Sequence, residues 1–594
     1  MDTSKSMNNL EIAELLRDVA ASYQLQDDKK NKFKIIAYQR AADAVEHMSS
    51  EAKDLWDDGK LEGVGGIGPS IAQHLGEIFK TGRSKHFDEL MKGIPPAVFE
   101  LMTIPGIGVK RAFRLVTELK VNSIAELKKA AESNKISGLE GFGEDSQSAI
   151  LKSVGEVKKD KKRMLLPYAT QTAQEIIDWV KKDPSVKHAD PLGSLRRKVS
   201  TVGDVDIAAA SDKPQQVLEH FTKYPHASRV LEKGTRSAAI ILPSGVQVDI
   251  LVGETATYGS ILQHFTGSKH HNVALREYAL KKGLSLSDYG IYTKPGDPKS
   301  LKEIATEEQF YKFLGMDWIP PELREDTGEI QAALDHKLPK LVEAKDIKAD
   351  LQIHSSFDIE TSHDLGASTM EEVISAANKL GYEYLAFTEH NPSKSKHSQK
   401  EIVDILKRKR EKVDKINYSI VKDVKSSVKK VFNSLEIDIL PNGELPVPEE
   451  GLATLDFALV SIHSSFRLPR QEMTARVLRA LEYPNVKIFA HPTGRKLNER
   501  EGIEVDWEKI FEACLTKNIW IEINSDPARL DLPDNLVHEA VKKGIKLTLG
   551  TDSHHKDGLV NMQYGVSVAR RGWATKSDII NTLSLNDFEK SLRG

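Results

Sequence analysis

Three aspartates lie in two short apolar segments, where their carboxylates could hold divalent cations. Asp204 and Asp206 stand in TVGDVDI with one residue between them, and Asp249 stands in VQVDILV. Alternate side chains of a β-strand share a face, so the first two carboxylates point the same way, and a paired second strand would add the third. Clustered carboxylates repel one another unless a cation lies between them, and oxygen ligands suit Mg²⁺. Two metals on three carboxylates can activate a 3′-OH and neutralise a leaving pyrophosphate.

The residues before the aspartate pair strengthen this interpretation. In GSLRRKVSTVGDVDI (193–207), Gly193, Ser194 and Arg197 stand on a predicted turn, where they could hold triphosphate oxygens. A D-x-D pair alone is weak evidence, because most such pairs are solvated strand ends. The G-S-x-R-R turn before the pair and the lone strand aspartate after it make the pattern far more specific.

This pattern marks the nucleotidyltransferase fold and resembles the palm of family X DNA polymerases. The segment HFTGSKHHNVALREYALKKGLSLSDYGIY (264–292) resembles the thumb of the same family. The resemblance implies that Phe265 and Gly267 line the sugar, that Asn272 contacts the base edge and that Arg276 touches the template side. It also implies that Gly203 belongs to the nucleotide-binding set. A tyrosine often precedes the phenylalanine in the family, and here that residue is His264.

Glycine-rich turns interrupt the helical N-terminal region at GVGGIGPS (63–70), IPGIGVKR (104–111) and GLEGFGED (138–145). Glycines beside a helix N-terminus leave backbone N–H groups open to a phosphate, without any basic side chain. A single copy would have about even odds of being a plain helix–helix turn. The first two copies resemble helix-hairpin-helix DNA-binding motifs, whereas acidic side chains in the third would repel a phosphate. The expected DNA contacts are Gly66, Gly68, Gly106, Gly108 and Lys110.

The resemblance also raises the question of a 5′-deoxyribose phosphate lyase in the N-terminal region. The lysine of the family's G-x-G-x-x-I-A-x-K pattern is His74 here, and the basic position before it is Ser70. Lys34, in FKIIAYQRAA, is the remaining candidate. Because a Schiff base needs a primary amine, we expect this activity to be weak or absent.

Beyond residue 346, short apolar strands alternate with helices, and nearly every strand ends in His, Glu or Asp. This alternation is typical of a parallel barrel-like α/β domain, in which strand C-termini converge on one site. One histidine at a strand end is more often a satisfied polar group than a ligand, but six such strands indicate a metal site. Imidazole and carboxylate ligands suit two or three Zn²⁺ or Mn²⁺ ions of a hydrolase. The residues are His354, Glu389, His390, Glu436, His463, His491, Asp552 and His554.

These strand ends resemble the PHP (polymerase and histidinol phosphatase) domain that follows many bacterial and archaeal family X polymerases. The resemblance implies hydrolysis of phosphoesters at DNA 3′ ends and, in some members, at abasic sites. Two positions depart from the family pattern: Gln352 replaces the first histidine of H-x-H, and Glu389 replaces the aspartate of T-D-H. The aspartate expected after the first motif is Asp358 or Asp364. The implied ligands are His354, His390, Glu436, His463, His491, Asp552 and His554, with Glu436 bridging two cations.

The composition describes an ordinary globular protein of 594 residues, 39% hydrophobic and 29% charged. No run of about 18 apolar residues predicts a membrane span, and the N-terminus lacks a secretory pattern. A single cysteine, Cys514, excludes an internal disulfide and favours a cytoplasmic, nucleoid-associated protein. The net charge of −3 argues against a bulk electrostatic nucleic-acid binder, so DNA binding must depend on local geometry.

The expected fold is multidomain: a helical helix-hairpin-helix N-terminal region, an α+β nucleotidyltransferase palm with a thumb, and a C-terminal α/β distorted barrel. The expected divisions are 1–82 (8-kDa-like), 83–160 (fingers-type), 161–256 (palm), 257–318 (thumb), 319–345 (linker) and 346–594 (PHP).

The leading hypothesis is an enzyme with two activities. A polymerase using Mg²⁺ or Mn²⁺ would add dNTPs to gapped or nicked double-stranded DNA, and a metal-dependent phosphoesterase or 3′–5′ exonuclease would process the same end. We expect a monomer without membrane association. One alternative is chiefly a hydrolase that the polymerase-like region targets to DNA. Another is a non-catalytic scaffold that binds DNA ends, which would require losses among the aspartates or histidines.

Overall fold

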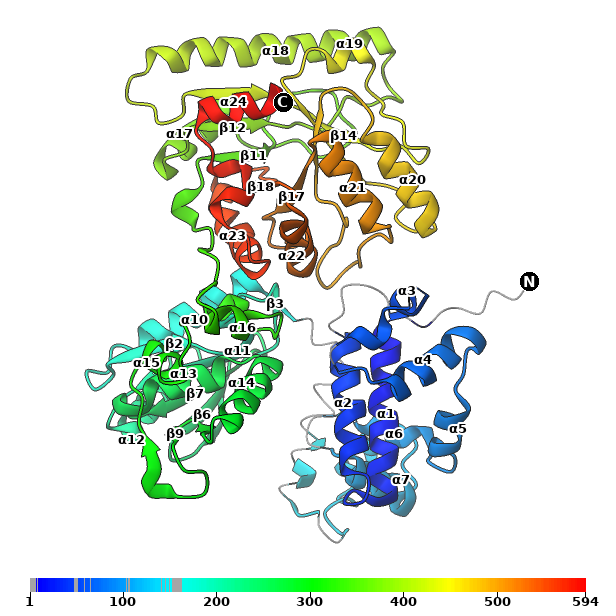
Figure 1. The fold of residues 1–594 in the computed structure, drawn as a ribbon, viewed down its shortest axis with the longest axis vertical. Helices are drawn as coiled ribbons and strands as arrows, with labels where there is room; N and C mark the ends of the chain where they lie inside the picture. Colours follow the sequence, from blue (N-terminus) through cyan, green and yellow to red (C-terminus); the bar gives the residue numbers. More distant parts are fainter. Residues whose placement is uncertain are drawn as a thin grey trace. The chain divides into compact units, whose positions relative to one another are not determined.

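The computed structural model describes residues 7, 9–46, 52–57, 59–64, 66–102, 104, 107–139, 142–144, 146–148, 150–151 and 163–593. The chain divides into two compact units, Met1–Lys162 and Arg163–Gly594 (Figure 1). Among the helices of these ranges, none is both long enough and apolar enough to cross a membrane.

The first unit is helical in its described residues, as the sequence predicts. Its first core joins the apolar faces of the first helices with those of α4 and α5, and its second core joins the helices that follow. The helices are α1 (Asn9–Asp27), α2 (Lys32–Glu46), α3 (Ala52–Asp57), α4 (Pro69–Thr81), α5 (Lys85–Met91), α6 (Pro96–Met102), α7 (Val109–Leu119) and α8 (Ile124–Glu132).

The second unit begins with a five-stranded sheet in the order β2-β4-β7-β6-β5. Its central strands, β4 and β7, are parallel, and the other neighbours are antiparallel. Apolar residues of α10 and α12, among them Ile176 and Phe221, pack into the core below the sheet. The elements are β1 (Met164–Leu165), α10 (Leu166–Val180), β2 (His188–Pro191), α11 (Gly193–Arg196), β3 (Thr201–Val202), β4 (Val205–Ala210), α12 (Pro214–Thr222), β5 (Arg229–Lys233), β6 (Ser237–Ile241) and β7 (Gln247–Gly253).

A second group of elements follows the sheet and has its own apolar core. The helical pattern predicted over 258–283 is two helices, broken at Gly267, whose φ of +70° lies in the region that favours glycine. The elements are α13 (Tyr258–Thr266), α14 (Lys269–Lys281), β8 (Ser285–Ser287), β9 (Gly290–Tyr292), β10 (Leu301–Lys302), α15 (Glu307–Phe313) and α16 (Glu329–Leu334).

The C-terminal part alternates parallel strands with helices. Its strands form two parallel sheets, β11-β12-β13 and β14-β15-β16-β17-β18. Parallel bridges from His390 to Glu436 and from Ile353 to Ser553 join these sheets at both ends. The strands are β11 (Ala349–Ile353), β12 (Tyr384–Phe387), β13 (Lys430–Asn433), β14 (Glu436–Asp438), β15 (Ala458–Ser461), β16 (Val486–Phe489), β17 (Trp520–Asn524) and β18 (Leu547–Gly550).

Six helices of this part lie between the strands in the sequence, and α23 and α24 follow the last strand. The helices are α17 (Met370–Leu380), α18 (Gln399–Lys422), α19 (Glu449–Leu452), α20 (Arg470–Ala480), α21 (Trp507–Lys517), α22 (Asp534–Lys543), α23 (Met562–Arg571) and α24 (Leu585–Arg593). The alternation of short strands with helices that the sequence predicts beyond residue 346 is confirmed. Both β11 and β12 are buried along their whole length; β12 reads as a continuous apolar run, whereas β11 includes the buried polar residues Asp350 and Gln352.

The Pro- and charge-rich segment between the thumb-like elements and β11 is folded. Leu323 and Arg324 are buried, and Trp573, just beyond α23, packs against the same core as Leu323. Arg570 of α23 donates from Nε to Glu322 Oε1 at 2.8 Å. The segment therefore packs firmly against the C-terminal part within the second unit.

Candidate active sites

The three aspartates predicted to act together lie beside one another in the structure. Asp206 on β4 is the register partner of Asp249 on β7, and Asp204 stands in the turn just before β4. Burial, with the negative charges of Asp204 and Asp249, raises the pKa of Asp206 to about 6. Burial also raises the pKa of Asp249, although Gln247 donates to its carboxylate. A cation between these crowded carboxylates would stabilise their ionised form.

Gly193 lies directly against the carboxylate of Asp206. It has a φ of +56°, and a Cβ built on it would stand 3.0 Å from Asp206 Oδ2. A side chain at this position would therefore be strained and would crowd the carboxylate. The predicted turn is the short helix α11, which contains Gly193 and Ser194 and has Arg197 as its C-cap.

The same turn is hydrogen-bonded to the end of α13. Arg197 Nη1 donates to the backbone oxygen of Thr266 at 2.6 Å, and Arg196 Nη1 donates to Thr266 Oγ1 at 2.6 Å. Phe265, which is 39% exposed, and Gly267 flank this threonine. The predicted triphosphate and sugar residues are thus brought together.

The other residues predicted to bind the nucleotide are Asn272, Arg276 and Gly203, and their roles stay predictions. Asn272 Nδ2 donates to the backbone oxygen of His264 at 2.7 Å, and Arg276 Nη2 is 3.4 Å from His264 Nδ1. Both residues therefore contact the histidine that replaces the expected tyrosine. Gly203 precedes Asp204, and a Cβ there would meet Arg163 Nη1 at 3.3 Å.

The histidines and acids of the C-terminal part form a second, denser site. Four sets of three side chains have ligand atoms within 4.8 Å of one another, and Glu436 belongs to two of them. Glu436 Oε1 lies 2.7 Å from His491 Nε2 and 3.3 Å from His463 Nε2. The sets are His354–His390–His554, His363–His390–His463, Glu436–His463–His491 and His354–Glu436–Asp552. All seven predicted ligands are members.

The donor atoms in this site fit divalent cations. His354 Nε2 lies 3.2 Å from Glu436 Oε2 and 3.1 Å from Asp552 Oδ1, but makes no hydrogen bond of good geometry. His390 Nδ1 is also buried without a hydrogen-bond partner among the described residues. Buried imidazole nitrogens that face carboxylates in this way suit shared metal coordination.

The charges of the second site are strongly coupled. Burial would lower the pKa of His354, but the adjacent carboxylates of Asp552 and Glu436 raise it to about 10. Burial lowers the pKa of His390 to about 3. The histidines around Glu436 hold the pKa of its buried carboxyl well below the usual range. His491 and Asp552 also have positive φ values, of 61° and 53°, which are uncommon for such residues and cluster at functional sites.

Two residues of this site were missed by the sequence analysis. Asp438 Oδ1 lies 2.7 Å from His463 Nδ1, and its Oδ2 lies 2.8 Å from His363 Nε2. Asp438 follows Glu436 by two residues on β14, so the period of a strand could have found it. His363 comes from a loop and carries no such signal. Asp358 and Asp364, which we expected after the first motif, are absent from the four sets.

The two departures from the family pattern are both engaged by other side chains. Glu389 Oε2 lies 2.6 Å from Nζ of the buried Lys409 in an ion pair, and Glu389 Oε1 accepts from Ser355 Oγ at 2.5 Å. Gln352 donates from Nε2 to Glu436 Oε2 at 2.8 Å. Glu389 is outside the four sets and is balanced by a lysine, whereas the amide of Gln352 is bonded to Glu436, a member of two sets.

The first two glycine hairpins end at helix N-termini. Gly68 caps α4 and Gly108 caps α7, and a Cβ on either would meet nothing within 4 Å. Gly66 has a φ of +99° and approaches the backbone of Arg40. Both caps therefore leave open space in front of free backbone N–H groups.

Three further hairpin features bear on the predicted DNA contacts. Lys110 Nζ pairs with Asp28 Oδ2 at 2.6 Å on the surface. Gly106, also predicted to bind DNA, lies outside the described residues, as does part of the third hairpin.

The lyase position contains a row of rings. His74 stacks on His86 at 4.5 Å between ring centroids, and Tyr23 Oη is 2.7 Å from His86 Nε2. Burial and His86 lower the pKa of His74. The amine of Lys34 lies 4.9 Å from the centroid of the Tyr23 ring. Lys34 therefore supplies an amine beside these stacked rings, but it comes from α2, whereas His74 is on α4.

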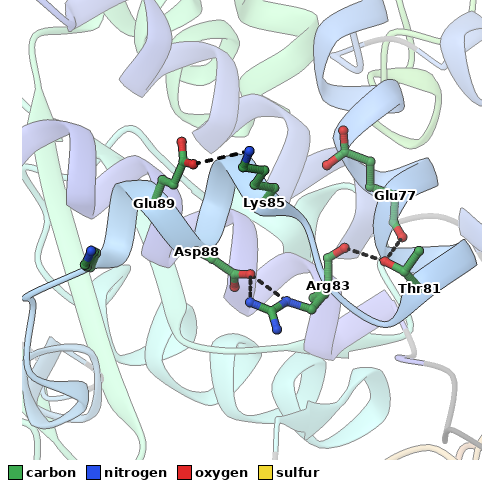
Figure 2. A pocket seen from close by; sticks show the side chains of 7 residues that line it. Glu77, Thr81, Arg83, Lys85, Asp88 and Glu89 are labelled. Atoms are coloured by element: carbon green, nitrogen blue, oxygen red, sulfur yellow. Dashed lines mark hydrogen bonds and ion pairs between the residues drawn. The ribbon is translucent and has the colours of Figure 1, made fainter.

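A hollow between α4 and α5 contains none of the predicted site residues. Figure 2 shows that its charges pair with one another: Arg83 Nη2 lies 2.7 Å from Asp88 Oδ2, and Lys85 Nζ lies 3.9 Å from Glu89 Oε1. The other lining residues are Glu77, Thr81 and Lys92. Because Arg83 and Lys85 are already paired with Asp88 and Glu89, we assign the hollow no role.

Comparisons with known proteins agree with these geometries. The model for the DNA polymerase beta thumb matches residues 261–325. The model for a helix-hairpin-helix domain matches residues 7–84, and that for a SAM-like helix-hairpin-helix tandem matches 98–155. With the carboxylates on β4 and β7, these matches define the class as DNA polymerases related to polymerase beta.

Full-length similarity gives the family. The DNA polymerase/3′-5′ exonuclease PolX of Bacillus subtilis is 33% identical over 589 residues, 99% of this chain and 100% of the relative. The chain therefore belongs to the PolX family of DNA polymerase/3′-5′ exonucleases, a branch of family X, which confirms the resemblance.

Two partial relatives are similar to different regions. DNA polymerase lambda of Rattus norvegicus is 24% identical over 352 residues, 53% of this chain and 56% of the relative. A probable phosphatase of Acetivibrio thermocellus is 28% identical over 195 residues, 32% of this chain and 73% of the relative, and covers the C-terminal part.

Proposed function

We propose that the protein fills short gaps in duplex DNA with dNTPs during repair, and that its C-terminal site removes or cleans nucleotides at the 3′ end. The observation that carries the polymerase assignment is the pairing of Asp206 with Asp249 on parallel strands, beneath the Gly193 turn. The domain divisions predicted from the sequence and a monomeric state belong to this proposal.

In nucleotide addition, Asp204, Asp206 and Asp249 would hold Mg²⁺ or Mn²⁺, and these ions would supply charge neutralisation and Lewis acidity. Asp249 accepts the proton of the primer 3′-OH or orients that hydroxyl for attack on the α-phosphate. Backbone N–H groups at Gly193 and Ser194, with the Arg197 guanidinium, orient the β- and γ-phosphates. Phe265 and Gly267 shape the sugar pocket, whereas Asn272 and Arg276 act toward the base and template.

In 3′-end processing, the seven predicted ligands with His363 and Asp438 would hold two or three Zn²⁺ or Mn²⁺ ions, which polarise a phosphoester and supply hydroxide when bound. Glu436 would contribute to more than one of these metal positions, which is supported by its two oxygens facing different histidines, Oε1 facing His463 and Oε2 facing His354. Support for a PHP-type distorted barrel comes from the two parallel sheets joined at both ends. An abasic-site endonuclease would use the same residues.

The helical unit would bind the phosphates that flank a gap. Open N-termini at Gly68 and Gly108 receive phosphates through backbone N–H groups, with Gly66 and Gly106 shaping the turns. Lys110 can join, because an exposed ion pair such as the one with Asp28 is weak and can be exchanged for a phosphate. We propose that lyase activity is weak or absent, because His74 replaces the expected amine and Lys34 is the remaining candidate.

The test is primer extension by the full chain on a duplex with a one-nucleotide gap, with Mg²⁺ or Mn²⁺, beside 3′-end degradation without dNTPs. Filling of the gap together with degradation of the 3′ end supports both activities. Degradation without any extension would favour the hydrolase alternative. Binding of the gapped duplex with neither reaction would favour the scaffold.

A further inference from the structure

Arg571, at the end of α23, contacts Arg197 beside the carboxylate site, although the two residues are far apart in the sequence. Its Nη1 donates to the backbone oxygen of Arg197 at 2.8 Å and to Glu325 Oε1 at 3.0 Å. The same Glu325 oxygen accepts from Arg197 Nε at 2.9 Å. One carboxylate oxygen therefore binds two guanidinium groups, one from the nucleotidyltransferase part and one from the C-terminal part.

The other side of Arg571 is anchored within the C-terminal part. Its Nε and Nη2 lie 2.8 Å and 2.6 Å from Oδ2 of Asp534, the first residue of α22. The Arg571 and Arg197 side chains are only 8% and 14% exposed. Burial alone would raise the pKa of Glu325, but Arg571 and Arg197 lower it, so this carboxylate stays ionised. Buried pairs of this kind are little screened by salt.

These contacts fix how Arg197 presents its guanidinium. Nε is used by Glu325 and Nη1 by the backbone oxygen of Thr266, which leaves Nη2 without an acceptor in the described part of the chain. Arg197 also lies four residues after Gly193, the glycine that covers Asp206. A guanidinium held by two of its nitrogens is pre-organised to offer the third to a phosphate oxygen.

We propose that Arg571 and Glu325 are positioning residues for nucleotide addition, which hold Arg197 in the orientation that binds the triphosphate. The proposal rests on the proposed role of Arg197. It means that the C-terminal part supports the polymerase site as well as carrying the second site. Without Arg571, Glu325 has a single cationic partner and the Arg197 backbone loses a donor, so the guanidinium can turn away.

The test is steady-state gap filling by the full chain at varied dNTP concentration. Arg571→Gln and Glu325→Gln should each raise the KM for dNTP about tenfold and change kcat less than about threefold, because they act on binding of the triphosphate. The Kd for gapped DNA and the 3′-end activity should stay within about twofold of the original protein. Arg571→Lys should recover only part of the effect, since an ammonium cannot replace a planar fork between two carboxylates.

Arg570→Gln is the matched control. Its neighbouring guanidinium donates to Glu322 and to the backbone oxygen of Val342, not to Glu325, so the KM for dNTP should be unchanged. If Arg571→Gln does not fold, as judged by lost 3′-end activity, Glu325→Gln carries the test.

Arg197→Ala, measured in parallel, separates this proposal from the proposed function. If Arg197→Ala leaves the KM for dNTP unchanged, the role of Arg197 in triphosphate binding is wrong. If it raises the KM while Arg571→Gln and Glu325→Gln behave like Arg570→Gln, the positioning proposal is overturned.

Discussion

The amide nitrogen of Gln352 donates a hydrogen bond to Oε2 of Glu436 at 2.8 Å, in the centre of the histidine-rich site. The amide oxygen of Gln352 accepts from Asn524 Nδ2 at 3.3 Å. An amide NH₂ has no lone pair for a cation, whereas the histidine expected at this position would have one. Gln352 therefore steadies the proposed bridging carboxylate where the family pattern has a further ligand.

Gln352→His should restore a ligand and increase the affinity of the isolated protein for Mn²⁺ on the order of tenfold, a typical effect of a change beside a metal ligand. Equilibrium dialysis followed by metal analysis measures this without reference to activity. Gln352→Leu is the control, because it removes the hydrogen bond without adding a ligand. Equal metal retention by the histidine and leucine variants would contradict the account.

Asp249→Ala should reduce nucleotide addition more than about a hundredfold, since the carboxylate is proposed to act on the 3′-OH and its metal. Binding of gapped DNA should be nearly intact, because this residue is not proposed to contact the DNA backbone. The control is Glu232→Ala, an exposed acid whose charge reaches Asp249 but which is proposed to hold no metal. Primer extension above about a hundredth of the original rate would show that the aspartate assignment is wrong.

Glu436→Ala and His491→Ala should each abolish Mn²⁺-stimulated 3′-end phosphoesterase activity, because their side chains meet at 2.7 Å in the centre of the site. Polymerisation by both variants should persist, because the aspartates lie on a different sheet. His538→Ala is the control, since this histidine is outside the four ligand sets. Degradation that depends on Asp249 instead, or a protein without bound transition metal, would count against the second site.

The sequence could predict those site residues that lie on strands, but not those that lie in loops or that only tertiary packing brings together. Asp206 and Asp249 stand on apolar strands, so their convergence was predictable once these two strands were expected to pair. His363 comes from a loop, and no local pattern specifies where a loop places its side chain. The Arg197–Glu325–Arg571 contacts join three distant segments, and only tertiary packing brings these residues together. Lys409, which neutralises Glu389, was hidden for the same reason.

Asp18 in α1 should make the first unit less stable as the pH rises. Burial, with the charge of Glu14, raises the pKa of Asp18 from 3.8 to about 7. The folded state therefore binds this proton more tightly than the unfolded state, so stability is lost as pH rises from about 4 through about 7. Asp18→Asn should remove this dependence and stabilise the unit by about 2 kcal/mol at pH 8. Hydrogen exchange of α1 amides at pH 5 and pH 8 measures it, and an unchanged pH dependence in the variant would contradict it.

The glycine hairpins provide the test of how the helical unit binds DNA. Gly68 and Gly108 have φ values of −82° and −77°, which valine tolerates, and a Cβ at either position points into open space. Gly68→Val and Gly108→Val should therefore fold normally but obstruct a phosphate at the helix N-terminus. Each should weaken binding of gapped duplex about five- to tenfold, the loss of roughly one phosphate hydrogen bond.

Gly143→Val supplies the matched control for these two variants. Gly143 occupies the same place in the third hairpin, where its backbone oxygen accepts from Gln147 N at 3.1 Å and a Cβ would also meet nothing within 4 Å. Because Glu144 follows it directly, that turn is a poor phosphate site, and the substitution should change the Kd less than twofold. Fluorescence anisotropy with a labelled gapped duplex gives all three values. Equal weakening by all three variants would indicate a general effect of valine on the hairpins, and no weakening by Gly68→Val or Gly108→Val would refute phosphate binding at these helix ends.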